Sequence, residues 1–118
     1  MVHGLKSILE DPSRPGTLLA SSGYHQAILR IHPHQEGVEL VAGAPDGSAG
    51  FTDSNVPSDS RFDNPEGMIF DAGGTRLLIC DKNNKAIRSL EMATGKVTLS
   101  IDGGTALSHS LAVGYRSR

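Results

Sequence analysis

GTLLASSGYHQAILRIHPHQEGVELVAG (residues 16–43) recurs 59 positions later, without a gap, as TRLLICDKNNKAIRSLEMATGKVTLSID (residues 75–102). The apolar positions coincide in pairs: Leu18 with Leu77, Leu19 with Leu78, Ala27 with Ala86, Ile28 with Ile87, Val38 with Val97 and Leu40 with Leu99. Self-similarity at a fixed period is the mark of a tandem array of one supersecondary unit. Because one unit cannot bury its hydrophobic face alone, the repeat predicts that the copies pack on each other.

Each copy divides into short apolar runs separated by turn residues, which predicts an all-β chain. The expected strands are 6–11, 17–21, 27–31 and 38–42 in the first copy, and 67–71, 76–81, 86–91 and 96–101 in the second. The last run, KVTLSI, alternates apolar and polar residues with the period of a half-buried strand. It follows a turn that needs a positive φ at Gly95.

Four short antiparallel strands per repeat, with Gly-rich corners, are typical of a β-propeller blade. This reading is favoured over a solenoid, which uses shorter parallel repeats, and over a sandwich, which needs no internal repetition. We therefore treat residues 1–118 as a single repeat unit. It divides into a first blade (5–43), a connection (44–66), a second blade (67–104) and a segment (105–118) that starts a further blade or forms a tail.

The composition sets limits on the core, the partners and the compartment. Hydrophobic residues make up 37% of the chain and aromatic residues 4%, so the core is built from Leu, Ile and Val. A formal net charge of −2 gives no sign of binding to nucleic acid or to an anionic membrane. The single cysteine, Cys80, cannot form an internal disulfide. With no signal peptide or transmembrane segment visible, we expect a soluble, intracellular, cytoplasmic chain.

The second copy resembles the NHL-repeat β-propellers over residues 61–103. It has an Arg-Phe-x-Asn-Pro-x-Gly lead-in (61–67), two apolar strands that each end in Asp, and Asn-Lys-Ala-Ile-Arg (84–88) where that family carries its Asn-His-Leu-like signature. Lys85 stands where His is common, and Ile87 stands for Leu. The resemblance covers about residues 5 to 104, and the first copy is the more degenerate. It implies two four-stranded antiparallel blades and part of a third strand set.

The recurrent residues of this motif have structural roles in our interpretation. Pro65 and Gly67 set a tight entry into the inner strand, where backbones crowd together. Asp71 and Asp81 stand at strand ends, where a carboxylate accepts the N–H groups of a turn, and Asn84 is expected to act alike in the left-handed conformation. The structural set is Asn64, Pro65, Gly67, Asp71, Asp81, Asn84 and Ile87.

Three groups of residues carry side chains that could form a chemical site. The acidic loop carrying Asp46, Asp53, Asp59 and Asp63 offers oxygen ligands for Ca²⁺, but its spacing is not that of an EF-hand, and a solvated connection with Asx turns is favoured. The His-Pro-His run (32–34) is read as a hairpin turn rather than a zinc site. Cys80 lies in an apolar run and is read as a buried thiol. We therefore predict no catalytic residue, metal or cofactor.

Lys82, Lys85 and Arg88 form a modest basic cluster, and they are the candidate interaction residues. The resemblance adds that some NHL proteins bind RNA through a basic face. Because this cluster has no interleaved aromatic residues, on a chain of net charge −2, nucleic acid is not the expected partner.

Two blades raise the question of what completes the fold, because propellers close with four to eight. Either copies of the chain assemble, for example three copies giving six blades, or it docks on another protein, or it is part of a longer propeller. The leading prediction is a non-catalytic protein-interaction or scaffold module. The alternative is part of a propeller enzyme of the metal-dependent lactonase, hydrolase or lyase type, to which Asn64, Glu66 and Asp71 would contribute.

Overall fold

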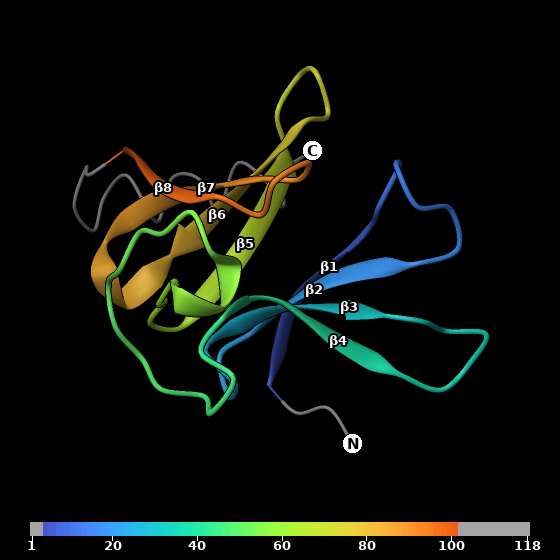
Figure 1. Cartoon of the computed structure of the whole chain (residues 1–118), viewed down its shortest axis with the longest axis horizontal. Coiled ribbons are helices and arrows are strands. Elements are labelled where there is room, and N and C mark those ends of the chain that lie inside the picture. Colours follow the sequence, from blue (N-terminus) through green and yellow to red (C-terminus); the bar gives the residue numbers. More distant parts are fainter. Residues whose placement is uncertain (1–3, 102–118) are drawn as a thin grey trace.

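A computed structural model describes residues 4–101 as two four-stranded antiparallel sheets (Figure 1). Sheet 1 has the order β1-β2-β3-β4, and sheet 2 has the order β5-β6-β7-β8. The strands of sheet 1 are β1 (Leu5–Glu10), β2 (Leu18–Ser22), β3 (Ala27–Ile31) and β4 (Val38–Gly43). Those of sheet 2 are β5 (Pro65–Phe70), β6 (Arg76–Asp81), β7 (Ala86–Glu91) and β8 (Val97–Ile101). All eight predicted strands are confirmed, with ends that differ by no more than two residues.

Two single-turn 3₁₀ helices interrupt the strands. One, η1 (Pro57–Asp59), lies in the connection between the sheets, and the other, η2 (Lys82–Asn84), joins β6 to β7. Neither was predicted, because three residues carry no periodic signal. Residues 105–118, expected to begin a further blade or form a tail, lie outside the described residues.

The repeat is visible in the backbone as well as in the sequence. A shift of 59 maps β2, β3 and β4 onto β6, β7 and β8, and it maps the irregularity after Ile28 in the β3–β4 pairing onto that after Ile87 in the β7–β8 pairing. Gln26 and Lys85, related by the same shift, both have a φ of 55°. The first strands correspond by a shift of 60 instead, since Ile8 pairs with Ala20 as Met68 pairs with Ile79. The two sheets are therefore two copies of one structural unit.

Two predictions about left-handed residues have different outcomes. Gly95 has the expected positive φ, at 81°, in the β7–β8 turn. The expectation for Asn84 is wrong, because Lys85 takes the left-handed conformation, with φ 55° and ψ 44°, and Asn84 lies within η2. Because the 3₁₀ turn of η2 includes Asn84, the left-handed residue that reverses the chain comes one position later than predicted.

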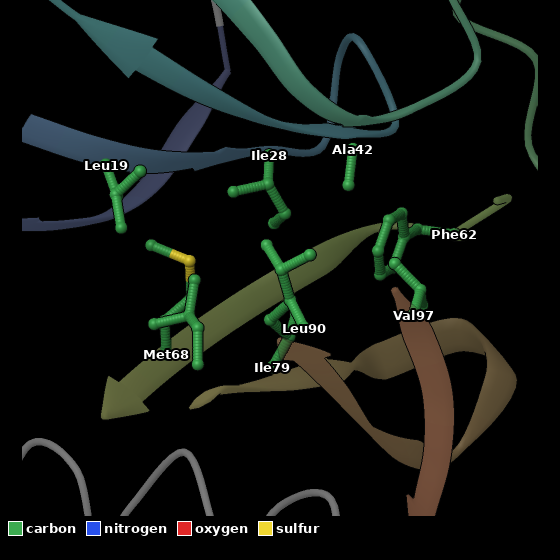
Figure 2. Close-up of a cluster of buried hydrophobic side chains, with 9 residues drawn as sticks. Leu19, Ile28, Ala42, Phe62, Met68, Ile79, Leu90 and Val97 are labelled. Carbon is green, nitrogen blue, oxygen red and sulfur yellow. The ribbon is translucent and has the colours of Figure 1, made fainter. Parts of the chain in front are cut away.

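The core lies between the two sheets (Figure 2). Leu19, Ile28 and Ala42 point from sheet 1 toward sheet 2, and Phe62 of the connection closes one side. Sheet 2 contributes the fully buried side chains of Met68, Leu77, Ile79, Leu90 and Val97. At roughly 25 cal/mol per Å² of apolar surface, this shared cluster is the main force that joins the sheets.

The two sheets use opposite faces of the repeat to meet each other. By the shifts given above, Leu77, Ile79, Leu90 and Val97 correspond to Leu18, Ala20, Ile31 and Val38. Leu18 and Ala20 flank Leu19 in β2, so they point to the face of sheet 1 that is turned away from sheet 2. The sheets are thus stacked front to back, as blades follow one another in a series, and not front to front.

Within the described part of the chain, no helix has the length and apolar character needed to cross a membrane.

Candidate interaction surface

The face of sheet 1 turned away from sheet 2 carries apolar side chains, and some of them stay in contact with solvent while others, such as Leu29, are buried. We call it the front face and define it by Ile8, Leu18, Leu29, Ile31, Val38 and Leu40. Ile8, Val38 and Leu40 are 49%, 46% and 38% exposed. The counterparts of Ile8 and Val38 on sheet 2, Met68 and Val97, are fully buried, whereas Leu99, the counterpart of Leu40, is 40% exposed. Two positions of the repeat, those of Ile8 and Val38, are therefore an interface on sheet 2 and solvent-exposed on sheet 1.

A groove of about 530 Å³ runs along one side of the front face. Its floor comes from Ala27, Leu29, Val38 and Leu40, and its rim includes Tyr24, whose side chain is 68% exposed. The residues just after β4 (44–47) form the opposite wall. The lining is part apolar and part polar, and it includes residues of β4, an edge strand of sheet 1.

On sheet 2 the corresponding place is occupied by the connection between the sheets. Ser54 pairs through its backbone with Val97, the first residue of edge strand β8, with N–O distances of 3.0 and 2.9 Å. The Asn84 side chain donates to the carbonyl of Gly50 at 2.8 Å, and the N–H of Leu99 donates to Asp53 at 3.0 Å. The connection thus covers the part of sheet 2 that corresponds to the groove of sheet 1, and in sheet 1 this part stays open.

The buried side chain of Arg88 contacts the connection and holds it in place. Its side chain is fully buried, with the guanidinium carbon 4.9 Å from the ring centre of Phe51 and 5.0 Å from that of Phe62. The guanidinium donates to Asp81 and Asp53, each at 2.8 Å. Burying an arginine is costly unless it is paired and hydrogen-bonded, and this one has both forms of compensation. It also donates to the carbonyls of Thr52 and Arg61 in the connection, both at 2.8 Å.

Sheet 1 has a different buried ion pair. Arg30 donates to Asp11 at 2.6 Å, and the two side chains are 8% and 1% exposed. Asp11 corresponds to Asp71, because the N–H of Asp11 bonds the carbonyl of Thr17 as that of Asp71 bonds Arg76. The two sheets therefore share a backbone and differ in where they place a buried charge.

The two buried carboxyl groups respond differently to their surroundings. Burial raises the pKa of Asp81, against the hydrogen bonds that it accepts from Asn84, from the N–H of Asp63 and from Arg88. Burial also acts to raise the pKa of Asp11, but hydrogen bonds from Arg30 and Ser13 outweigh it and leave this pKa below its ordinary value.

The residues predicted to be structural occupy strand ends and turns. Asp71 accepts the N–H groups of Thr75 and Arg76 at 3.0 and 3.2 Å, as expected for a carboxylate that closes a turn. Asp81 accepts the N–H of Asp63 at 2.8 Å, and it also contacts Arg88, which the sequence did not indicate.

At the start of β5, Asn64 has a φ of 60°, and its N–H donates to the side chain of Gln26 at 2.6 Å. Pro65 and Gly67 are buried, in line with a crowded entry to the strand. Ile87 is 5% exposed.

The structure separates the three residues of the basic cluster. Lys82 and Lys85 are exposed, and Lys82 lies 3.7 Å from Glu66. Arg88 is fully buried and is part of the interior, so it is not available to a partner. The repeat does contain an indication that Arg88 is buried, because its counterpart in the first copy is the apolar residue Leu29.

The acidic loop, the His-Pro-His run and Cys80 are engaged in local contacts or buried. Asp46 accepts hydrogen bonds from the N–H and hydroxyl of Ser48 in an Asx turn, which lowers its pKa. His32 contacts Glu39 across the β3–β4 hairpin at 2.5 Å, and the pKa of Glu39 is lowered by this bond. Cys80 is 1% exposed, as predicted. Over residues 4–101, no three His, Cys, Asp or Glu side chains gather as a metal site.

No protein-family model matches this sequence, and no curated protein does. Solved structures do resemble it. One is an auxiliary nutrient binding protein from Bacteroides ovatus, with a TM-score of 0.62 and 19% identity. Another is an auxiliary nutrient binding protein from Bacteroides thetaiotaomicron, with a TM-score of 0.62 and 21% identity. Each alignment covers 78% of this chain and 24% of the solved chain. The chain therefore shares a fold with about a quarter of each of those proteins.

Proposed function

We propose that the chain is a non-catalytic protein-interaction or scaffold module made of two NHL-type propeller blades. Its fold is completed by further blades, which come from other copies or from a larger complex. The exposed front face is the surface through which it binds.

One observation carries this proposal. The front-to-back stacking buries Met68 and Val97 fully, whereas their counterparts Ile8 and Val38 are 49% and 46% exposed. Burying an aliphatic side chain of this size stabilises a structure by about 1.5–3 kcal/mol. An interface in which one face of a unit meets the opposite face of the next is heterologous, and such interfaces build a ring when the rotation closes and an open array when it does not.

The resembling structures are consistent with a larger whole. The fold of this chain corresponds to 24% of each of those chains, so the same arrangement occurs there alongside further structure. Their names concern nutrient binding, and we carry none of that activity to this chain, because identities of 19% and 21% support a shared fold alone.

The test is the absolute mass of the purified chain across a range of concentrations, by light scattering, with circular dichroism as the check on folding. We expect species heavier than the 12.4 kDa of one chain. Their circular dichroism spectra should be those of a folded β protein. A folded, monodisperse monomer at every concentration would contradict the proposal, since the front face would then need no partner.

A further inference from the structure

We infer that the groove of sheet 1 binds an extended segment of a partner protein, which adds to edge strand β4 and places an apolar side chain over Leu29. Residues 50–54 of the connection cover the same part of sheet 2, and the partner segment is their counterpart on sheet 1. This inference rests on the proposed function, and it names what binds in the groove along the front face.

The first step is that the groove corresponds, residue by residue, to the part of sheet 2 that the connection covers. The residues of sheet 2 that bond residues 50–54 include Asn84, Arg88, Val97 and Leu99. By the shift of 59 their counterparts are His25, Leu29, Val38 and Leu40. All of these counterparts line the groove. Sheet 1 therefore repeats the positions with which sheet 2 holds an extended segment.

The second step concerns the backbone of the edge strand. On sheet 2, Val97 exchanges two backbone hydrogen bonds with Ser54, and these groups of Val97 point away from β7. The β3–β4 and β7–β8 pairings have the same register after the shift of 59, so Val38 turns its N–H and C=O away from β3. Among residues 4–101, β4 pairs only with β3. An edge of this kind is a template for an added strand.

The third step gives the chemistry of the segment. On sheet 2, Arg88 donates to the carboxylate of Asp53 at 2.8 Å, but its counterpart Leu29 carries no charge. An acidic side chain over Leu29 would lose water without gaining a counter-ion, so this position suits an apolar side chain. Such a side chain would also cover Val38 and Leu40, which are 46% and 38% exposed. Residues 50–54 of a second copy carry Asp53 and do not meet this requirement, so the segment belongs to a different protein.

The test uses the full-length chain and two fluorescently labelled peptides. One peptide has the sequence of residues 49–56, and the other has the same sequence with Asp53→Leu. Fluorescence anisotropy measures the affinity of the chain for each. We expect the Asp53→Leu peptide to bind at least about tenfold more tightly, because it buries no carboxylate on Leu29.

Two modified peptides test the pairing with β4. N-methylation of the Asp53→Leu peptide at Ser54 removes the N–H that would bond the carbonyl of Val38, and it should abolish binding. N-methylation at Asn55 is the control, because successive N–H groups of an extended strand point to opposite sides. It should leave the affinity nearly unchanged.

Two variants of the chain test the end of the groove. His25 stands where Asn84 donates to the carbonyl of Gly50 on sheet 2, so its ring should donate to a carbonyl of the peptide. His25→Ala should weaken binding by about two- to tenfold for the loss of one hydrogen bond. His34→Ala is the control, since His34 is exposed in the β3–β4 turn and does not line the groove.

Equal affinities for the two unmethylated peptides would overturn the inference, as would equal losses from the two N-methyl groups. If neither peptide binds while the unmodified chain is oligomeric, the inference fails and the proposed function stands, with sheet packing as the mode of association. A monomeric chain that binds neither peptide would remove both.

Discussion

The most demanding residue in this fold is Arg88, a cation enclosed between two aromatic rings and two carboxylates. It contacts Phe51, Phe62 and Asp53 from the connection, and Asp81 from the end of β6. A charge in such a place stabilises the structure only while its buried counter-ion Asp81 remains, because the loss of that carboxylate leaves Arg88 as an unpaired buried charge. Its role is thus to fasten the connection to sheet 2.

We expect Asp81→Ala to lower the free energy of unfolding by about 3–5 kcal/mol, because it leaves Arg88 buried without its main counter-ion. Asp53→Ala is the matched control, since the side chain of Asp53 is 45% exposed and water can replace it. Its cost should stay near 1 kcal/mol. Urea denaturation followed by circular dichroism measures both, and equal losses would argue against this account of Arg88.

The ion pair between Asp11 and Arg30 predicts how stability depends on pH. The pKa of Asp11 is lower in the folded chain than in the unfolded chain, where it is about 3.9. The unfolded state therefore binds the proton more readily. The stabilisation is fully present above the unfolded pKa and is lost as pH falls through the folded pKa.

Asp11→Asn should accordingly destabilise the protein at pH 7, by roughly 1.5–3 kcal/mol for a charged hydrogen bond. The difference between the variant and the unmodified chain should shrink as the pH is lowered below about 4. Thermal melting of both chains from pH 7 down to 3 tests this. A gap that is constant over that range would show that the charge of Asp11 is not responsible.

At the scale of elements, the strands are simple and the connection is the specialised part. It crosses from sheet 1, pairs at Ser54 with the edge of β8, and inserts Phe62 into the core. In the same segment Pro57, the first residue of η1, packs beside the turn that joins β7 to β8. The edge of sheet 2 is thus covered by residues that come before it in the chain.

The glycines of two hairpin turns should differ in their tolerance of a methyl group. Gly95 has a φ of 81°, and an added Cβ would meet Pro57 at 2.9 Å, whereas Gly74 has a φ of 72° and nothing within 4 Å. Gly74→Ala should cost about 1–2 kcal/mol for the left-handed backbone alone. Gly95→Ala should cost more, because η1 must also move. Their thermal midpoints, compared in parallel, check the order, and equal shifts would contradict the packing of η1 on this turn.

At the scale of the whole molecule, the open front face governs association. Ile8→Lys together with Val38→Lys places two charges where a neighbouring sheet would have to pack, at sites that are already half-exposed. We expect this variant to remain folded and to shift to the mass of one chain. Val56→Lys is the control, since Val56 is 50% exposed and lies in the connection, off the front face. Unchanged oligomers in the double variant, measured by light scattering, would place the contact elsewhere.

Much of this architecture could be predicted from the sequence, for a definable reason. The repeat and the alternation of residues such as Val97, Thr98 and Leu99 report strand position directly, because each strand packs on at least one face. Alternation does not reveal which face of one sheet meets which face of the other, so the front-to-back stacking came only from the structure.

The role of Arg88 was missed for a related reason. A strand arginine next to Lys82 and Lys85 resembles a surface charge, and its partners Asp53, Phe51 and Phe62 lie 26 to 37 residues away in sequence. The useful signal was a mismatch between the two copies of the repeat: the position of Arg88 in the second copy is occupied by Leu29 in the first. An apolar position that becomes charged in one copy indicates that the buried site has acquired partners from outside the repeat.

Because each sheet consists of consecutive strands, the chain has a natural order of folding during synthesis. Every strand pairs with its neighbour in sequence, and such local contacts form quickly. Sheet 1 is complete at residue 43, before any of sheet 2 has left the ribosome, and the connection emerges next. When β5 to β8 follow, they pack on the apolar side of sheet 1 and bring Arg88 and Val97, the residues to which the connection attaches, so the connection is fastened only as the second half folds.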